Sequence, residues 1–130
     1  MAQPTALTPE LARSLESFAQ AWTSGDLDAF LAHWTPDAIF WPPDGAELRG
    51  RDAIREWAIQ LGETANLAVE LLHVERLSGM FFTVGNFTQD ATLQGQRVHF
   101  RGGFTSIHVE QGGALKVHRM VSFQERAVPR

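Results

Sequence analysis

Hydrophobic residues recur at every third or fourth position through the first half of the chain, which is the spacing of amphipathic helices. Three helices are therefore expected, over residues 9–24, 27–34 and 51–61. Asp26 supplies a capping side chain for the second helix. Pro36 is expected to stop that helix, because proline lacks the N–H that a helix interior needs. The short apolar run over residues 38–41 is interpreted as a strand.

From Asn66 onward the spacing changes to alternation, which is typical of strands with one buried face. Long strands are expected over residues 67–76, 80–92, 96–110 and 114–125. Tight turns are expected between them at Ser78-Gly79, Gln94-Gly95 and Gly112-Gly113. Gly102-Gly103 falls inside the third strand and indicates a bulge or a bend. Three helices followed by such a meander predict an α+β fold with the helices on one face of a sheet.

The length of 130 residues corresponds to a single domain spanning residues 1–130, with an ordered core over about 8–125. The chain has no cysteine, which excludes a disulfide framework and a thiol nucleophile. Its net charge of −4 argues against a nucleic-acid partner. No apolar run approaches the roughly 18 residues of a membrane helix. The first seven residues lack the pattern of a signal peptide, so the expected location is the cytoplasm.

Large aromatic side chains gather in the half of the chain that is expected to be helical: Phe18, Trp22, Trp34, Trp41 and Trp57. A bent sheet with helices on one face leaves a hollow that these side chains can line. An apolar hollow with a few polar groups is typical of a small-molecule site. The same aromatics can instead fill a solid core, and the sequence leaves both interpretations open.

Three stretches of the chain resemble the nuclear transport factor 2-like superfamily, which includes ketosteroid isomerases and SnoaL-like polyketide cyclases. They read AWTSGDLDAFLAHWTPDAIFWPP, LRGRDAIREW and GGALKVHRMVSF, and the resemblance spans about residues 8–125. It implies a cone-shaped, curved and mostly antiparallel sheet with three N-terminal helices packed on its concave face. It also implies a site at the mouth of the cone and a homodimer formed through the sheet.

The chain lacks the chemical groups of the isomerase site that this resemblance suggests. Where the isomerases carry an oxyanion-stabilising tyrosine, seven positions before the Gly-Asp pair, this chain has Phe18. At the position of the general-base aspartate it has Pro42, and the second, protonated acid falls near Thr105. We therefore do not expect ketosteroid isomerisation by that mechanism.

The last strand offers the best candidate for acid–base chemistry, His118. Strand alternation puts His118, Met120 and Ser122 on one face and Val121 and Phe123 on the other. The resemblance implies that the His118 face looks into the cavity and that the apolar face forms the dimer. Periodicity alone leaves the reverse assignment open. An imidazole exchanges protons near neutral pH, while the alternative is a half-buried histidine hydrogen-bonded to a neighbouring strand.

Polar residues elsewhere complete the candidate site. Arg101 and His99 share a face of the third long strand, and Thr105 shares it if no bulge intervenes. An inward Arg101 would hold a carboxylate or stabilise an enolate oxygen, and an inward Asn86 would orient a carbonyl or hydroxyl group. Facing outward, both would be ordinary surface residues. Asp44 lies in a Pro-Asp-Gly sequence, as a displaced base or as the first polar residue of a turn.

The sequence thus predicts a SnoaL-like small-molecule pocket protein. Its catalytic form would be a cofactor-independent isomerase, cyclase or hydratase acting on a small apolar carbonyl or carboxylate compound. The candidate catalytic residues are His118, Arg101 and Asp44. The candidate ligand-binding residues are Phe18, Trp22, Trp41, Trp57, Asn86, His99, Thr105, Met120 and Ser122. The alternative is a non-catalytic ligand-binding or dimeric association domain. No metal and no cofactor are expected, because metal-ligand spacings on a helix and nucleotide fingerprints are absent from the sequence.

Overall fold

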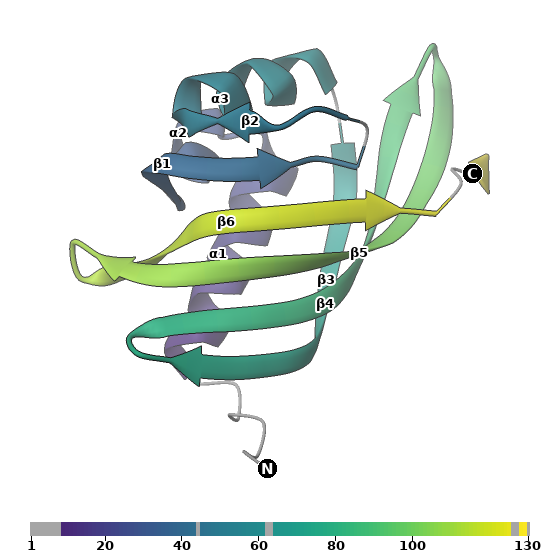
Figure 1. Ribbon diagram of the computed structural model, residues 1–130. Coiled ribbons are helices and arrows are strands. Elements are labelled where there is room, and N and C mark those ends of the chain that lie inside the picture. The colour runs from purple at the N-terminus through teal and green to yellow at the C-terminus, as the bar shows by residue number, and fades with distance from the viewer. Residues whose placement is uncertain (1–8, 44, 62–63, 126–127, 130) are drawn as a thin grey trace.

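The computed structural model describes residues 9–43, 45–61, 64–125 and 128–129. Its helices are α1 (Pro9–Ser24), α2 (Leu27–Leu31) and α3 (Gly50–Leu61). Its strands are β1 (Trp34–Trp41), β2 (Leu48–Arg49), β3 (Thr64–Leu77), β4 (Met80–Leu93), β5 (Gln96–Gln111), β6 (Ala114–Gln124) and β7 (Val128–Pro129). The expected α+β class is confirmed, with helices beside a curved, open sheet (Figure 1).

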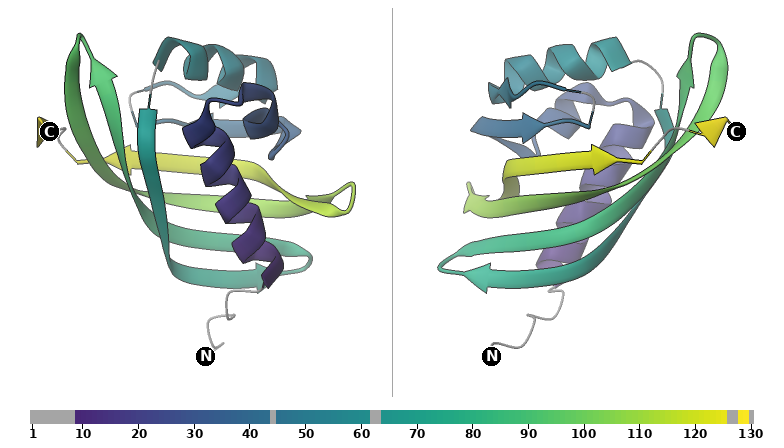
Figure 2. Two further views of the ribbon diagram at one scale, coloured as in Figure 1. Left: turned by 180° about the vertical axis from the view of Figure 1, so that it is seen from behind. Right: turned by 45° about the vertical axis from the view of Figure 1, so that its right-hand side comes forward.

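The strands form one sheet in the order β2-β1-β6-β5-β4-β3, and β7 pairs with β5. Neighbouring strands are antiparallel except for β1 and β6, which run parallel. The long strands β3 to β6 bend, and α1 runs across the hollow side of that bend, whereas α3 lies beyond β1 and β2 (Figure 2). The turns between the long strands fall where they were expected, with positive φ at Ser78-Gly79, Gln94-Gly95 and Gly112-Gly113.

The second helix is shorter than the sequence pattern predicted. Asp26 caps it as expected, because its Oδ1 accepts a hydrogen bond of 3.1 Å from the backbone N–H of Ala29. The helix ends at Leu31, however, and Trp34 opens β1. The expectation that Pro36 stops the helix was wrong, since this proline lies inside β1. It is tolerated there because the pairing of β1 with β6 is interrupted between Trp34 and Ile39.

The glycine pair inside β5 does not form a bulge, which was one of the two features expected there. Gly102 and Gly103 keep their register with both neighbouring strands, and the shift in β5–β6 pairing lies further on, between Ile107 and His108. A Cβ on Gly103 would stand 2.5 Å from the Phe123 ring. The glycine therefore lets that ring lie flat against the sheet.

The core contains two main clusters of buried apolar residues. One surrounds Trp34, which is fully buried, and includes Phe30, Phe40 and Val117. The other joins the start of α1 to the sheet through Leu11, Val74, Phe81 and Leu115. Among the helices that the structure describes, none combines the length and the apolar character needed to cross a bilayer.

Candidate ligand-binding cavity

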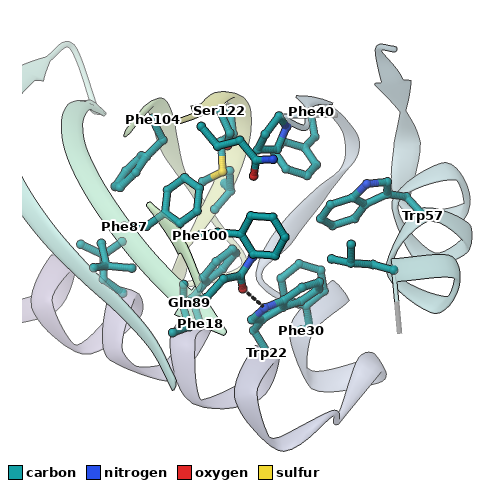
Figure 3. Close-up of a pocket in the computed structure, with 18 of the residues that line it drawn as sticks. Phe18, Trp22, Phe30, Phe40, Trp57, Phe87, Gln89, Phe100, Phe104 and Ser122 are labelled. Atoms are coloured by element: carbon teal, nitrogen blue, oxygen red, sulfur yellow. Dashed lines mark hydrogen bonds between the residues drawn. The ribbon is translucent and has the colours of Figure 1, made fainter. Parts of the chain in front are cut away.

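A cavity of about 240 Å³ lies between α1, α3 and the inner face of the sheet (Figure 3). Its walls are mainly aromatic and aliphatic. Helices α1 and α3 contribute Leu15, Phe18, Trp22, Trp57 and Leu61, and the loop after β1 contributes Pro43. The strands and the α2–β1 region contribute Phe30, Trp34, Phe40, Leu67, Val69, Phe87, Gln89, Ala91, Phe100, Phe104, His108, Val117, Met120, Ser122 and Gln124.

The aromatic rings on one side of the cavity hold each other in place. Trp22 of α1 and Trp57 of α3 stack with ring centroids 5.5 Å apart and planes 17° apart. Phe40 of β1 meets Trp57 edge-on at 5.1 Å, and Phe30 lies 4.8 Å from Trp22. Such contacts fix ring orientations. The cavity therefore presents preformed apolar surfaces suited to a flat ligand.

Few polar groups face this space. Trp22 Nε1 donates a hydrogen bond of 2.9 Å to Gln89 Oε1, drawn as the dashed line in Figure 3. Ser122 and Gln124 of β6 and His108 of β5 supply the other polar side chains, apart from the indole N–H groups. None of the described residues that line the cavity is Asp, Glu, Lys or Arg. Its polarity thus comes from amides, a hydroxyl, indoles and an imidazole.

His108 is the most deeply buried of these polar groups, with 1% of its surface exposed. Its Nε2 lies 2.9 Å from Ser106 Oγ, and the Ser106 and Thr83 hydroxyls are hydrogen-bonded to each other. Burial lowers the pKa of His108 to about 4, because water no longer solvates the charged form. The imidazole is therefore neutral at neutral pH.

The cavity contains five of the residues that the sequence proposed for ligand binding: Phe18, Trp22, Trp57, Met120 and Ser122. Trp41 does not line it, since it pairs with Val121 on the opposite face while its neighbour Phe40 points inward. Asp44 lies outside the described residues.

The last strand presents Met120 and Ser122 to the cavity, but the expectation that His118 shares their face was wrong, because β6 contains a bulge. Ile107 of β5 pairs with Arg119, and His108 pairs with Val117, so His118 is an extra residue without a register partner on β5. The bulge reverses the alternation. Val117 therefore lines the cavity together with Met120 and Ser122, and His118 is outside the lining.

His118 instead contacts polar residues of β1. Its Nδ1 lies 3.0 Å from Thr35 Oγ1 and 3.7 Å from Asp37 Oδ1. The Thr35 hydrogen bond is the first cause of a lowered Asp37 pKa, and the His118 and Arg119 charges add to it. The structure thus places His118 in a partly exposed polar cluster.

The polar candidates on β4 and β5 also lie away from the cavity. Arg101 and Asn86 are brought together, but they line a groove on the outer face with Phe123 and Glu125. Arg101 Nη2 donates to Glu125 Oε2 at 2.8 Å. Thr105 pairs with Val121, which is exposed on that face.

The remaining candidate, His99, lies outside the cavity as well. Its Nδ1 is 2.8 Å from the buried carboxylate of Asp90, which also accepts from Asn66. Within the described ranges, no group of three or more His, Asp or Glu residues is close enough to hold a metal ion.

His108, Gln89 and Gln124 line the cavity but were not among the sequence candidates. The sequence does contain a signal that His108 faces inward. It shares strand parity with Phe100 and Phe104, two large apolar residues of the kind that mark an inward face. The amides carry no such signal, because alternating glutamines are equally common on solvated strand faces.

A family model described as a SnoaL-like domain matches residues 15–118. The chain therefore belongs to the SnoaL-like family, and the resemblance to the nuclear transport factor 2-like superfamily is confirmed. No curated protein matches the chain.

Solved structures with the same fold are similar over nearly the whole chain. One is a ketosteroid isomerase-like protein from Erwinia carotovora atroseptica, with a TM-score of 0.79 and 15% identity, covering 94% of this chain and 98% of that one. A hexachlorocyclohexane dehydrochlorinase has a TM-score of 0.81 at 13% identity, covering 93% and 86%. Aln2 from a Streptomyces species has a TM-score of 0.80 at 20% identity, covering 95% and 94%. At these identities the likeness establishes the fold and leaves the reaction to the site.

Proposed function

We propose that this protein binds a small, uncharged and largely apolar molecule in the cavity, which the sheet and helices enclose as a cone. The reaction proposed for the site is a cofactor-independent proton shift, as in an isomerisation, a cyclisation or a hydration. The observation that carries the proposal is an aromatic cavity whose described lining residues include no acidic or basic side chain apart from a neutral imidazole.

The uncharged wall favours one of the two ligand groups expected from the sequence. A carboxylate inside this cavity would lose its hydration without meeting a cationic partner among the described lining residues. Burying an unpaired charge costs several kcal/mol, whereas a carbonyl needs only hydrogen-bond donors. We therefore propose that the ligand is a neutral carbonyl compound rather than an acid.

His108 is the group that supports a proton shift. Among the described lining residues, its side chain is the one that ordinarily exchanges protons between pH 4 and 8. Its position inside an apolar cavity brings it next to whatever is bound there. Proton exchange between His108 and a ligand carbonyl oxygen is thus the step this site supports best.

Calorimetric titration with two bicyclic probes, 1-tetralone and its parent hydrocarbon tetralin, tests the binding proposal. We expect both to bind to the wild-type protein. Ser122→Phe should abolish binding, because Ser122 lines the cavity. Val121→Phe is the matched control, since its exposed side chain belongs to the opposite face, and it should bind both probes normally. If the wild-type protein binds neither probe, the binding proposal is contradicted.

A second candidate, an association domain, is favoured by the outer face of the sheet. Phe123 and Val121 are 62% and 43% exposed there, and the Arg101–Glu125 ion pair flanks Phe123. A patch with one cation and one anion can be self-complementary across a two-fold axis. We propose that a second copy of the chain covers this face.

Light scattering at micromolar concentration tests the dimer. We expect a dimer for the wild-type protein and a monomer for Phe123→Asp, with tetralone binding retained in the variant. A wild-type monomer would contradict the dimer. A dimer that binds neither probe would favour the association domain over the small-molecule protein.

A further inference from the structure

Two buried polar atoms in the wall of the cavity lack a hydrogen-bond partner among the described residues. They are Nε1 of Trp34 and Nδ1 of His108. Both side chains are almost completely buried, and both residues line the cavity. Buried polar groups in folded proteins are nearly always paired, so each unpaired one requires an explanation.

The pairing of the strands places these two residues in one row. Trp34 of β1 is the register partner of Val117 in β6, and Val117 is the register partner of His108 in β5. All three line the cavity. Neighbouring strands lie about 5 Å apart, so the two backbones are separated by about 10 Å. An indole and an imidazole that extend from this row are long enough to reach one small ligand between them.

The hydroxyl groups behind His108 determine which of its nitrogens carries the proton. Ser106 Oγ contacts both Thr83 Oγ1 and His108 Nε2. If Nε2–H donated to Ser106 and Ser106 donated to Thr83, the buried Thr83 hydroxyl proton would have no acceptor among the described residues. In the opposite direction, Thr83 donates to Ser106 and Ser106 donates to Nε2, and every hydroxyl proton is used. His108 then carries its proton on Nδ1.

We propose that Trp34 Nε1–H and His108 Nδ1–H form a paired donor site for one carbonyl oxygen of the ligand. This inference rests on the proposed function. The indole nitrogen can only donate, so its partner has to be an acceptor. A carbonyl oxygen has two lone pairs and accepts from both groups. Thr83 and Ser106 are positioning residues, which hold the imidazole in the tautomer that donates.

The uncharged state of His108 fits this role. Burial keeps its pKa near 4, so at neutral pH the ring has one N–H and bears no charge. Two neutral donors polarise a carbonyl without binding a carboxylate tightly.

Calorimetry with 1-tetralone and tetralin tests the pair through the ratio of the two affinities, which cancels changes in apolar packing. We expect the wild-type protein to bind tetralone about tenfold more tightly, the effect of one to two net hydrogen bonds. Trp34→Phe and His108→Phe should each lower this ratio severalfold. Ser106→Ala should lower it while leaving the tetralin affinity unchanged. Trp41→Phe, which changes a tryptophan outside the cavity lining, should leave the ratio unchanged.

Two spectroscopic measurements need no variant and keep the test decisive if a substituted chain fails to fold. Nitrogen NMR of the wild-type protein should show Nδ1 of His108 protonated and Nε2 bare. The infrared carbonyl band of bound tetralone should move to lower frequency than in an apolar solvent. Equal affinity for the two probes, or an Nε2–H tautomer, would overturn the paired donor site and leave the small-molecule proposal standing. Binding of neither probe would overturn both.

Discussion

The two faces of the sheet hold histidines in opposite environments. His108 on the inner face is buried in an apolar wall, contacts one hydroxyl and stays neutral. His118 in the bulge of β6 is partly exposed and lies beside Thr35 and Asp37. The residue type is the same in both places. The environment makes one of them a candidate ligand group and the other part of a surface polar cluster.

The difference extends to the other ionisable side chains. The Arg101–Glu125 pair and the His99–Asp90 pair lie away from the cavity, whereas the described inner wall holds no acid or base other than His108. Charged groups remain where water or a counter-ion solvates them, and the apolar hollow keeps only groups that are neutral. Chemical candidates chosen by residue type alone therefore fall mostly on the outer face.

The largest expected effect that separates the faces is the pH dependence of stability. The unfolded chain protonates His108 near pH 6.5, but the folded protein protonates it only near pH 4. Between these values the unfolded state binds more protons, so stability falls as the pH is lowered. The full difference amounts to about 3 kcal/mol. Urea unfolding from pH 7 to pH 4 should show this loss in the wild-type protein.

A single variant isolates the contribution of His108. His108→Gln should have a flatter pH profile than the wild-type protein over the same window. His33 also has a lowered pKa, from burial and from the Lys116 charge, and its contribution is common to both proteins. Identical profiles for wild type and His108→Gln would contradict a buried, neutral His108.

A smaller effect is expected from closing the space behind Phe104. A Cβ on Gly85 would stand 2.7 Å from the Phe104 ring and 2.6 Å from the Glu70 carbonyl oxygen. Gly85→Ala should therefore push the ring toward the cavity and destabilise the fold by about 1–3 kcal/mol. It should also weaken tetralone binding. Gly45→Ala meets nothing within 4 Å and should change neither property, and equal effects of the two substitutions would argue against a cavity shaped by Gly85.

The smallest effect is expected from the outer polar residues. His118→Ala and Arg101→Ala should change tetralone affinity by less than about twofold, since neither residue lines the cavity. Calorimetry measures this directly. A tenfold or larger loss of tetralone affinity in either variant would indicate that the substituted residue belongs to the ligand site.

Most of the fold was predictable from the sequence because period and turn residues act locally. The glycine turns and the change from helix to strand after residue 61 follow from the chain itself. The end of α2 was not predictable from the sequence, since Trp34 joins β1 through pairing with the distant β6. Tertiary pairing overrode the local helical pattern at this point.

The site was predictable only in its apolar part. Phe18, Trp22 and Trp57 were expected from helical spacing and line the cavity. The polar part depended on strand register, and one extra residue in β6 reversed the faces on which His118 and Val117 were expected. No local signal marks that bulge, because it results from the pairing of β6 with β1 and β5. His108 could be recognised once the inward parity of β5 was known.

The most direct test of an uncharged cavity is a calorimetric comparison of 1-tetralone with 1,2,3,4-tetrahydro-1-naphthoate at pH 7. The two probes share a bicyclic frame and differ in a neutral carbonyl against a carboxylate. We expect the ketone to bind at least about a hundredfold more tightly, because the acid would leave a buried charge unpaired. Equal or tighter binding of the naphthoate would contradict an uncharged cavity.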